Sequence, residues 1–149
     1  MPSELGAEAE MLLPFRWQEI LPGWTVEYHG PRSTHRGLAF PYEKRVEIYV
    51  RDTDTPSSLA GILSHELGHA VDVEYLTDAD RYDWMRVRGI DSLTWWPDEY
   101  LTDFHTGAGD FAEAFAYRTV GDPSTSKAAG PLTAEQLSII DGVLQRALG

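Results

Sequence analysis

The sequence predicts a small α+β fold in which a group of short strands is followed by several helices. Three strand candidates lie between residues 24 and 50, and the last of them, 45–50, alternates apolar and polar side chains at the period of a strand. Beyond residue 51 the apolar residues recur at helical spacing, with helix start signals ahead of them. Strands gathered in one part of a chain and helices in another are typical of the α+β class.

Length and composition indicate one compact domain over residues 1–149. The chain has 149 residues, and 42% apolar side chains are enough for a single hydrophobic core. It carries 12 Lys and Arg against 24 Asp and Glu, which gives a formal net charge of -12. This charge disfavours nucleic acid as a partner, because phosphate binding depends on clustered cations. An acidic, solvated surface is its simplest meaning.

The absence of cysteine restricts any metal site to His, Asp, Glu and water as ligands. The first 13 residues carry three glutamates and no cation, whereas a secretory signal begins with a basic region. No apolar run reaches the length of a membrane span. We therefore expect a cytoplasmic protein without a membrane partner, with export by another route as the alternative.

Each expected element has a local signal, beginning with an N-terminal segment at 3–21 that is helical and interrupted by Pro14. A small antiparallel sheet is expected next, packed on the helix that follows it. Thr55 and Pro56 then start a long helix over 56–75. The expected strands are 24–28, 37–40 and 45–50, and the further helices are 78–89, 110–120 and one beginning at the capping box 133–136.

The chemical centre is the segment Ser-His-Glu-Leu-Gly-His at 64–69, which contains the H-E-x-x-H arrangement. His65 and His69 lie one helical turn apart, so their imidazoles face a common metal ion, and two facing imidazoles suit zinc. Glu66 lies about 100° further round an ideal helix, where it reaches a water on the metal without binding the metal. We predict a zinc site with Glu66 as general base. The alternative is a coincidental pair of solvated histidines, which would be costly on a half-buried helix face.

Three downstream residues are candidates for completing the site. Asp110 and Glu113 are three apart and share a face of the expected helix, although the same pair also forms a helix start that needs no metal. Asp110 is the preferred third ligand, because Gly107 and Gly109 leave room for its short side chain to approach the metal. Glu113 is then expected to support a ligand histidine, or to be the ligand itself. His105 is expected to line the cleft or to stabilise a developing oxyanion.

The order of strand, motif helix and downstream acidic helix resembles the zincin superfamily of metallopeptidases. Residues 109–116, Gly-Asp-Phe-Ala-Glu-Ala-Phe-Ala, resemble the second helix of gluzincins, and an Asp ligand would make the site aspzincin-like. The metzincin pattern is not matched, since Asp72 stands at the position of its Gly and Tyr75 at that of its third ligand. The resemblance implies a zincin-like fold and zinc-dependent hydrolysis of a peptide or protein substrate, held by backbone pairing along the strand 45–50.

Two other functions remain as alternatives. One is a non-catalytic, zinc-stabilised binding or regulatory module, which Glu66 disfavours because a purely structural site needs no base. The other is a narrow-specificity protease of a toxin-like or phage-encoded kind. Tyr100 and Tyr117 are further candidates for an oxyanion donor, with packing as the simpler role. The sequence specifies neither the cleaved peptide nor the oligomeric state.

Overall fold

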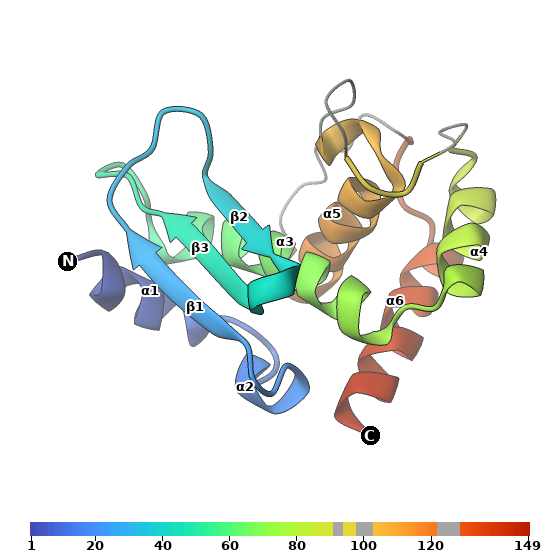
Figure 1. Cartoon of the computed structure of the whole chain (residues 1–149), viewed down its shortest axis with the longest axis horizontal. Helices are drawn as coiled ribbons and strands as arrows, with labels where there is room; N and C mark the ends of the chain where they lie inside the picture. The colour runs from blue at the N-terminus through green and yellow to red at the C-terminus, as the bar shows by residue number, and fades with distance from the viewer. Residues whose placement is uncertain (91–93, 98–102, 122–128) are drawn as a thin grey trace.

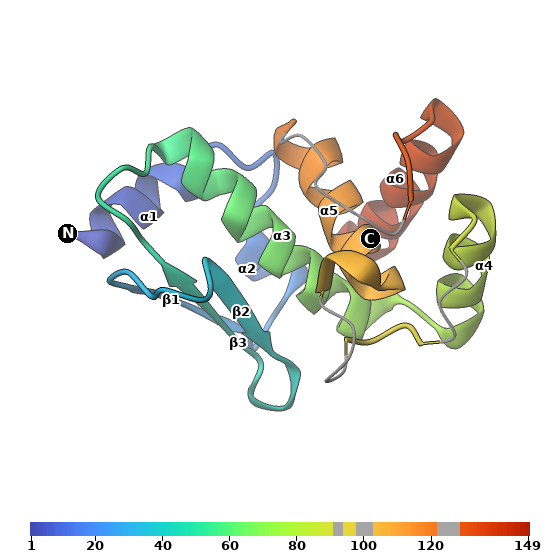
Figure 2. The ribbon, with the colours of Figure 1, turned by 90° about the horizontal axis from the view of Figure 1, so that it is seen from above.

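A computed structural model describes residues 1–90, 94–97, 103–121 and 129–149 and confirms the α+β class. The long helix α3 runs through the middle of the molecule, with the sheet and α1 at one end and α4, α5 and α6 at the other (Figures 1 and 2). The elements are α1 (Pro2–Glu10), α2 (Trp17–Ile20), β1 (Thr25–His29), β2 (Gly37–Phe40), the 3-10 helix η1 (Pro41–Glu43), β3 (Arg45–Tyr49), α3 (Pro56–Tyr75), α4 (Asp78–Arg88), the 3-10 helix η2 (Asp103–His105), α5 (Gly107–Val120) and α6 (Ala134–Leu148).

The sheet is mixed, so the expectation of an antiparallel sheet is wrong for one of its two pairings. Its strand order is β1-β3-β2, with β2 antiparallel and β1 parallel to β3. The short η1 connection, ending at Lys44 in the left-handed region (φ 49°), folds β3 back onto β2 as a hairpin. The longer connection 30–36 lets β3 enter between β1 and β2. Strands that are neighbours in sequence are therefore not all neighbours in the sheet.

The position of β3 contradicts the expectation that a substrate pairs with the backbone of the strand 45–50, which requires an edge strand. β3 is the central strand, with hydrogen-bonded partners on both sides. Its Val46 and Ile48 are fully buried under α3, which accounts for the strong alternation seen in the sequence. The edge strand beside α3 is β2.

Helix α3 begins as expected and packs closely against α5. The Thr55 side chain accepts a hydrogen bond from the Ser58 backbone N–H, and the Ser58 side-chain oxygen accepts one from the Thr55 backbone N–H, which together form a capping box. At Gly68, inside the motif, a Cβ atom would lie 3.0 Å from Ala112 Cα and 3.1 Å from Phe115 Cβ. This glycine lets α5 approach the histidine-bearing turns of α3.

Among the described residues, no helix combines the length and apolar character needed to cross a membrane.

Candidate metal centre

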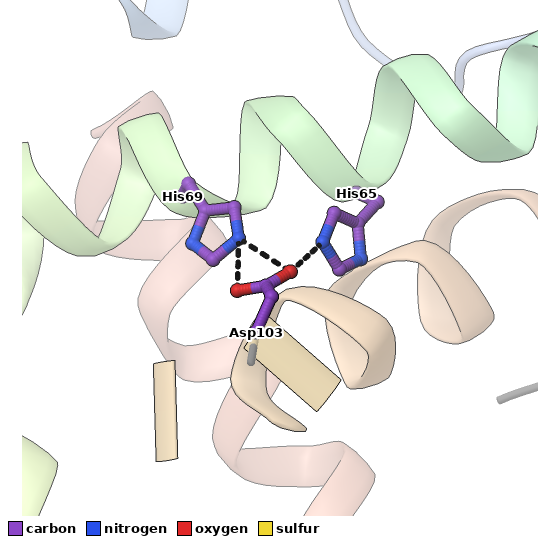
Figure 3. A group of neighbouring side chains, drawn as sticks. All are labelled: His65, His69 and Asp103. Atoms are coloured by element: carbon purple, nitrogen blue, oxygen red, sulfur yellow. Dashed lines mark hydrogen bonds and ion pairs between the residues drawn. The ribbon is translucent and has the colours of Figure 1, made fainter. Parts of the chain in front are cut away.

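Two turns of α3 and the 3-10 helix η2 bring together three side chains that could bind a metal ion. Figure 3 shows the rings of His65 and His69 projecting from α3 toward the carboxylate of Asp103. The Nε2 atom of His65 lies 2.7 Å from Asp103 Oδ2, and Nε2 of His69 lies 3.0 Å from Oδ1 and 3.2 Å from Oδ2. All three donor atoms lie within 4.8 Å of one another.

The donor set fits zinc in both chemistry and spacing. Two imidazoles and one carboxylate are the three protein ligands of many catalytic zinc sites, which keep a fourth position for water or substrate. Tetrahedral bonds of about 2.0–2.1 Å would place these donors roughly 3.3 Å apart. The distances of 2.7 to 3.2 Å in the structure need an outward shift of a few tenths of an ångström, which rotation of the side chains can supply.

The electrostatic surroundings favour a cation at this position. Burial lowers the pKa of His65, but hydrogen bonds with Asp103 and Glu113 more than compensate and raise it to about 10. Burial likewise opposes ionisation of Asp103, yet its contacts with the two histidines hold its pKa well below the usual range. The neighbouring carboxylates therefore favour positive charge at the rings, which is the condition that a divalent cation needs.

Glu66 lies beside the donors without being one of them. Glu66 is 7% exposed. Burial raises the pKa of its carboxyl group, and the charges of His65, His69 and His35 oppose this rise. Its stem packs against the start of β2, where a Cβ on Gly37 would lie only 2.8 Å from Glu66 Cγ. The absence of a side chain at Gly37 gives this carboxylate its space.

Glu113 makes the supporting contact that the sequence suggested for it. Glu113 lies on α5, and its Oε1 accepts a hydrogen bond from Nδ1 of His65 at 2.6 Å. This contact directs the Nε2 atom of the same ring toward Asp103. Glu113 is 5% exposed, so the hydrogen bond is shielded from water.

The structure does not bring Asp110, the predicted third ligand, together with the two histidines. Its carboxylate is committed to a buried cluster, in which Arg88 donates to both oxygens at 2.8 and 2.9 Å and Trp84 Nε1 donates at 2.9 Å. The glycines near it do permit a close approach, but a different group makes that approach. A Cβ on Gly109 would overlap the backbone carbonyl of Asp103.

Asp103 was missed because it lies in a segment with no apolar periodicity. The available signals were the N-cap residue Thr106 and Gly109 just after it, which together indicate a chain folded tightly against a helix start. His105 ends η2 with an exposed side chain and is not one of the three donors, so its role at the cleft stays a prediction. Tyr100 lies outside the described residues, and Tyr117 is 42% exposed on α5.

A second group of possible metal ligands lies on the sheet. Glu27 and Glu47 are paired across β1 and β3, and His29 Nε2 lies 3.1 Å from Glu27 Oε1 and 3.2 Å from Glu47 Oε1. Arg45 approaches the same two carboxylates at 3.8 and 3.7 Å. Glu27 and His29 are exposed, whereas Glu47 is partly buried.

Comparison of the chain with protein-family models, with curated proteins and with solved structures found no match. The zincin resemblance rests on the sequence alone, at residues 65–69 and 109–116.

Proposed function

We propose that this protein is a zinc-dependent metallopeptidase that hydrolyses peptide bonds with Glu66 as general base. The observation that carries the proposal is the convergence of His65, His69 and Asp103, with Glu66 buried beside them and outside the donor set. A structural zinc site closes with a fourth protein ligand and needs no neighbouring base. A three-ligand site beside a carboxylate is the arrangement of a hydrolase.

The chain's own residues divide the chemistry between them. Zinc bound to the three donors would supply a Lewis acid and would lower the pKa of a water molecule to about 7. Glu66 accepts the proton of the attacking water and returns it to the leaving amine. Burial raises the pKa of this carboxyl group, which brings it closer to the pH at which one group can both take and give a proton. Glu113 keeps the His65 ring in the orientation that presents Nε2.

The edge strand β2 supplies a way to hold an extended peptide. Within the described sheet β2 pairs with β3 on one side only, which leaves the backbone groups of its other side for a substrate strand. Its first residue, Gly37, lies against Glu66. A peptide added to β2 would run past the general base and the three donors, so β2 takes the role that the sequence had suggested for 45–50.

The test is to separate metal binding from turnover. The purified protein is incubated with a mixed peptide library and zinc, with and without a chelator, and cleavage is followed by mass spectrometry. Glu66→Gln keeps the shape and the zinc, and turnover should fall by about two orders of magnitude or more. Equal cleavage by the variant and the wild type would sink the mechanism. Stoichiometric zinc with no cleavage by the wild type would favour the non-catalytic module instead.

A further inference from the structure

One buried carboxylate near the site takes no part in the chemistry described so far. Asp72 lies on α3 three residues after His69 and is fully buried. Its Oδ2 accepts a hydrogen bond from Trp95 Nε1 at 2.6 Å, and its Oδ1 accepts one from Arg81 Nε at 2.8 Å. A carboxylate removed from water is costly unless it is held by such partners, so these contacts fix the positions of all three side chains.

Trp95 also contacts the beginning of α5. Its backbone oxygen accepts a hydrogen bond from the Ala108 N–H at 2.9 Å. Its indole ring lies directly against Gly107, where a Cβ atom would be 2.6 Å from Cε3 of the ring. The indole is therefore clamped between Asp72 on one helix and the first turn of the other.

The first turn of α5 in turn holds Asp103. Both the backbone N–H and the side-chain hydroxyl of Thr106 donate to the carbonyl oxygen of Asp103, at 3.2 and 2.9 Å. The bare Cα of Gly109 lets that carbonyl approach the helix. The contacts thus form one continuous path from α3, through Trp95 and the α5 start, to the residue that faces the two histidines.

We propose that Asp72 is a positioning residue of the metal centre, which holds the Asp103 carboxylate in front of His65 and His69 through Trp95 and the first turn of α5. The inference rests on the metal centre of the proposed function and not on peptide cleavage. A metal site whose third ligand comes from a short 3-10 helix needs such support, because a misplaced ligand weakens the whole donor set.

The experiment measures metal affinity and coordination without any substrate. Zinc affinity is obtained by competition with a chelator, and the visible absorption spectrum of the cobalt(II) form reports the coordination geometry. Asp72→Ala should lower zinc affinity by about ten- to a hundredfold and alter the cobalt spectrum. Asp72→Asn keeps an oxygen that can accept the Trp95 N–H and should recover most of the affinity. If Asn is as impaired as Ala, the negative charge and not the anchorage is what matters, and the proposal is wrong.

The chain offers a matched control, because a second buried Asp is held by the same kinds of partner. Asp110 accepts hydrogen bonds from Trp84 Nε1 and from Arg88. Trp95→Phe and Trp84→Phe each remove one indole N–H that donates to a buried carboxylate. Both changes are smaller than Asp72→Ala, so they keep the proposal testable if Asp72→Ala does not fold. Only Trp95→Phe should weaken zinc binding. Equal affinities for the two Phe variants would overturn the proposal.

The outcomes separate this inference from the proposed function. Wild-type protein that binds zinc but cleaves nothing leaves the positioning role of Asp72 in place and removes the peptidase. Wild-type protein that binds no zinc overturns both. Normal zinc affinity and an unchanged cobalt spectrum in folded Asp72→Ala overturn the positioning role alone.

Discussion

The described residues contain two groups of side chains that could hold a metal ion, and they differ in what surrounds them. His65, His69 and Asp103 form one group, and Glu27, His29 and Glu47, on the sheet, form the other. Donor atoms lie within the same 4.8 Å in both. The side chain of His65 is 9% exposed, however, whereas that of His29 is 43% exposed. Proximity of donors is common to the two groups, and burial of the histidines is not. The carboxylates do not follow this difference, since Asp103 is 30% exposed and Glu47 is 18% exposed.

The difference shows what makes a donor cluster a site. On the sheet, each carboxylate already has Arg45 as a neighbour, and long, partly exposed ion pairs of this kind contribute about 1 kcal/mol or less. On α3, the helix fixes the spacing of the rings, and Glu113 fixes the orientation of His65. A metal bound there meets donors that are already ordered. We therefore expect zinc at the α3 group alone.

The largest effect should come from removing one imidazole of the buried group. His65→Ala or His69→Ala leaves two protein donors and should abolish stoichiometric zinc, while His29→Ala should leave about one zinc per chain. Elemental analysis after gel filtration measures the metal content. Zinc that persists in the double variant of the buried pair, or disappears in His29→Ala, would reverse the comparison of the two groups.

A smaller but still large effect should distinguish the two aspartates near the start of α5. Asp103→Asn removes a ligand charge and should weaken zinc binding by more than the roughly ten- to hundredfold that a supporting residue costs. Asp110→Asn should leave zinc affinity nearly unchanged and lower the free energy of unfolding, because Arg88 is then buried without its charged partner. Chelator competition and urea unfolding measure the two quantities. Loss of zinc in Asp110→Asn alone would reinstate Asp110 as the ligand.

The correct and incorrect expectations from the sequence follow the range of the interactions involved. The motif histidines and the start of α3 at Thr55 depend on residues within a turn or two of one another, so a local pattern contains the information. The pairing of β1 with β3 and the approach of Asp103 depend on how distant segments pack. No periodicity encodes them, and both were missed.

Asp110 illustrates the physical reason most clearly. The glycines beside it indicated a close approach, and a close approach exists, but the group that makes it is the Asp103 carbonyl. The sequence spacing predicted that Asp110 binds a zinc ion, but the cation that it contacts in the structure is the guanidinium of Arg88, on α4. Which cation a buried carboxylate meets is decided by tertiary packing, which the sequence pattern alone does not specify.

The smallest effect compares two glutamates that each contact a histidine. Glu113 Oε1 lies 2.6 Å from His65 Nδ1, and Glu47 Oε1 lies 3.2 Å from His29 Nε2. Glu113→Gln preserves the size of the side chain but makes it a weaker hydrogen-bond acceptor for His65 Nδ1. The His65 ring is then less firmly oriented and becomes a poorer zinc ligand. Zinc affinity should fall by about ten- to a hundredfold while the stoichiometry at saturating zinc stays at one.

Glu47→Gln is the matched control, because it makes the same chemical change in the group on the sheet. It should leave zinc affinity unchanged and alter the free energy of unfolding by about 1 kcal/mol or less, as expected for an ion pair whose histidine is 43% exposed. Chelator competition on both variants measures the difference. If Glu113→Gln strips the metal completely, Glu113 is itself a ligand and the site is of the gluzincin kind. If the two variants lose zinc equally, burial of the histidine does not decide which group binds zinc. The group on the sheet must then be counted as part of the metal-binding capacity of this chain.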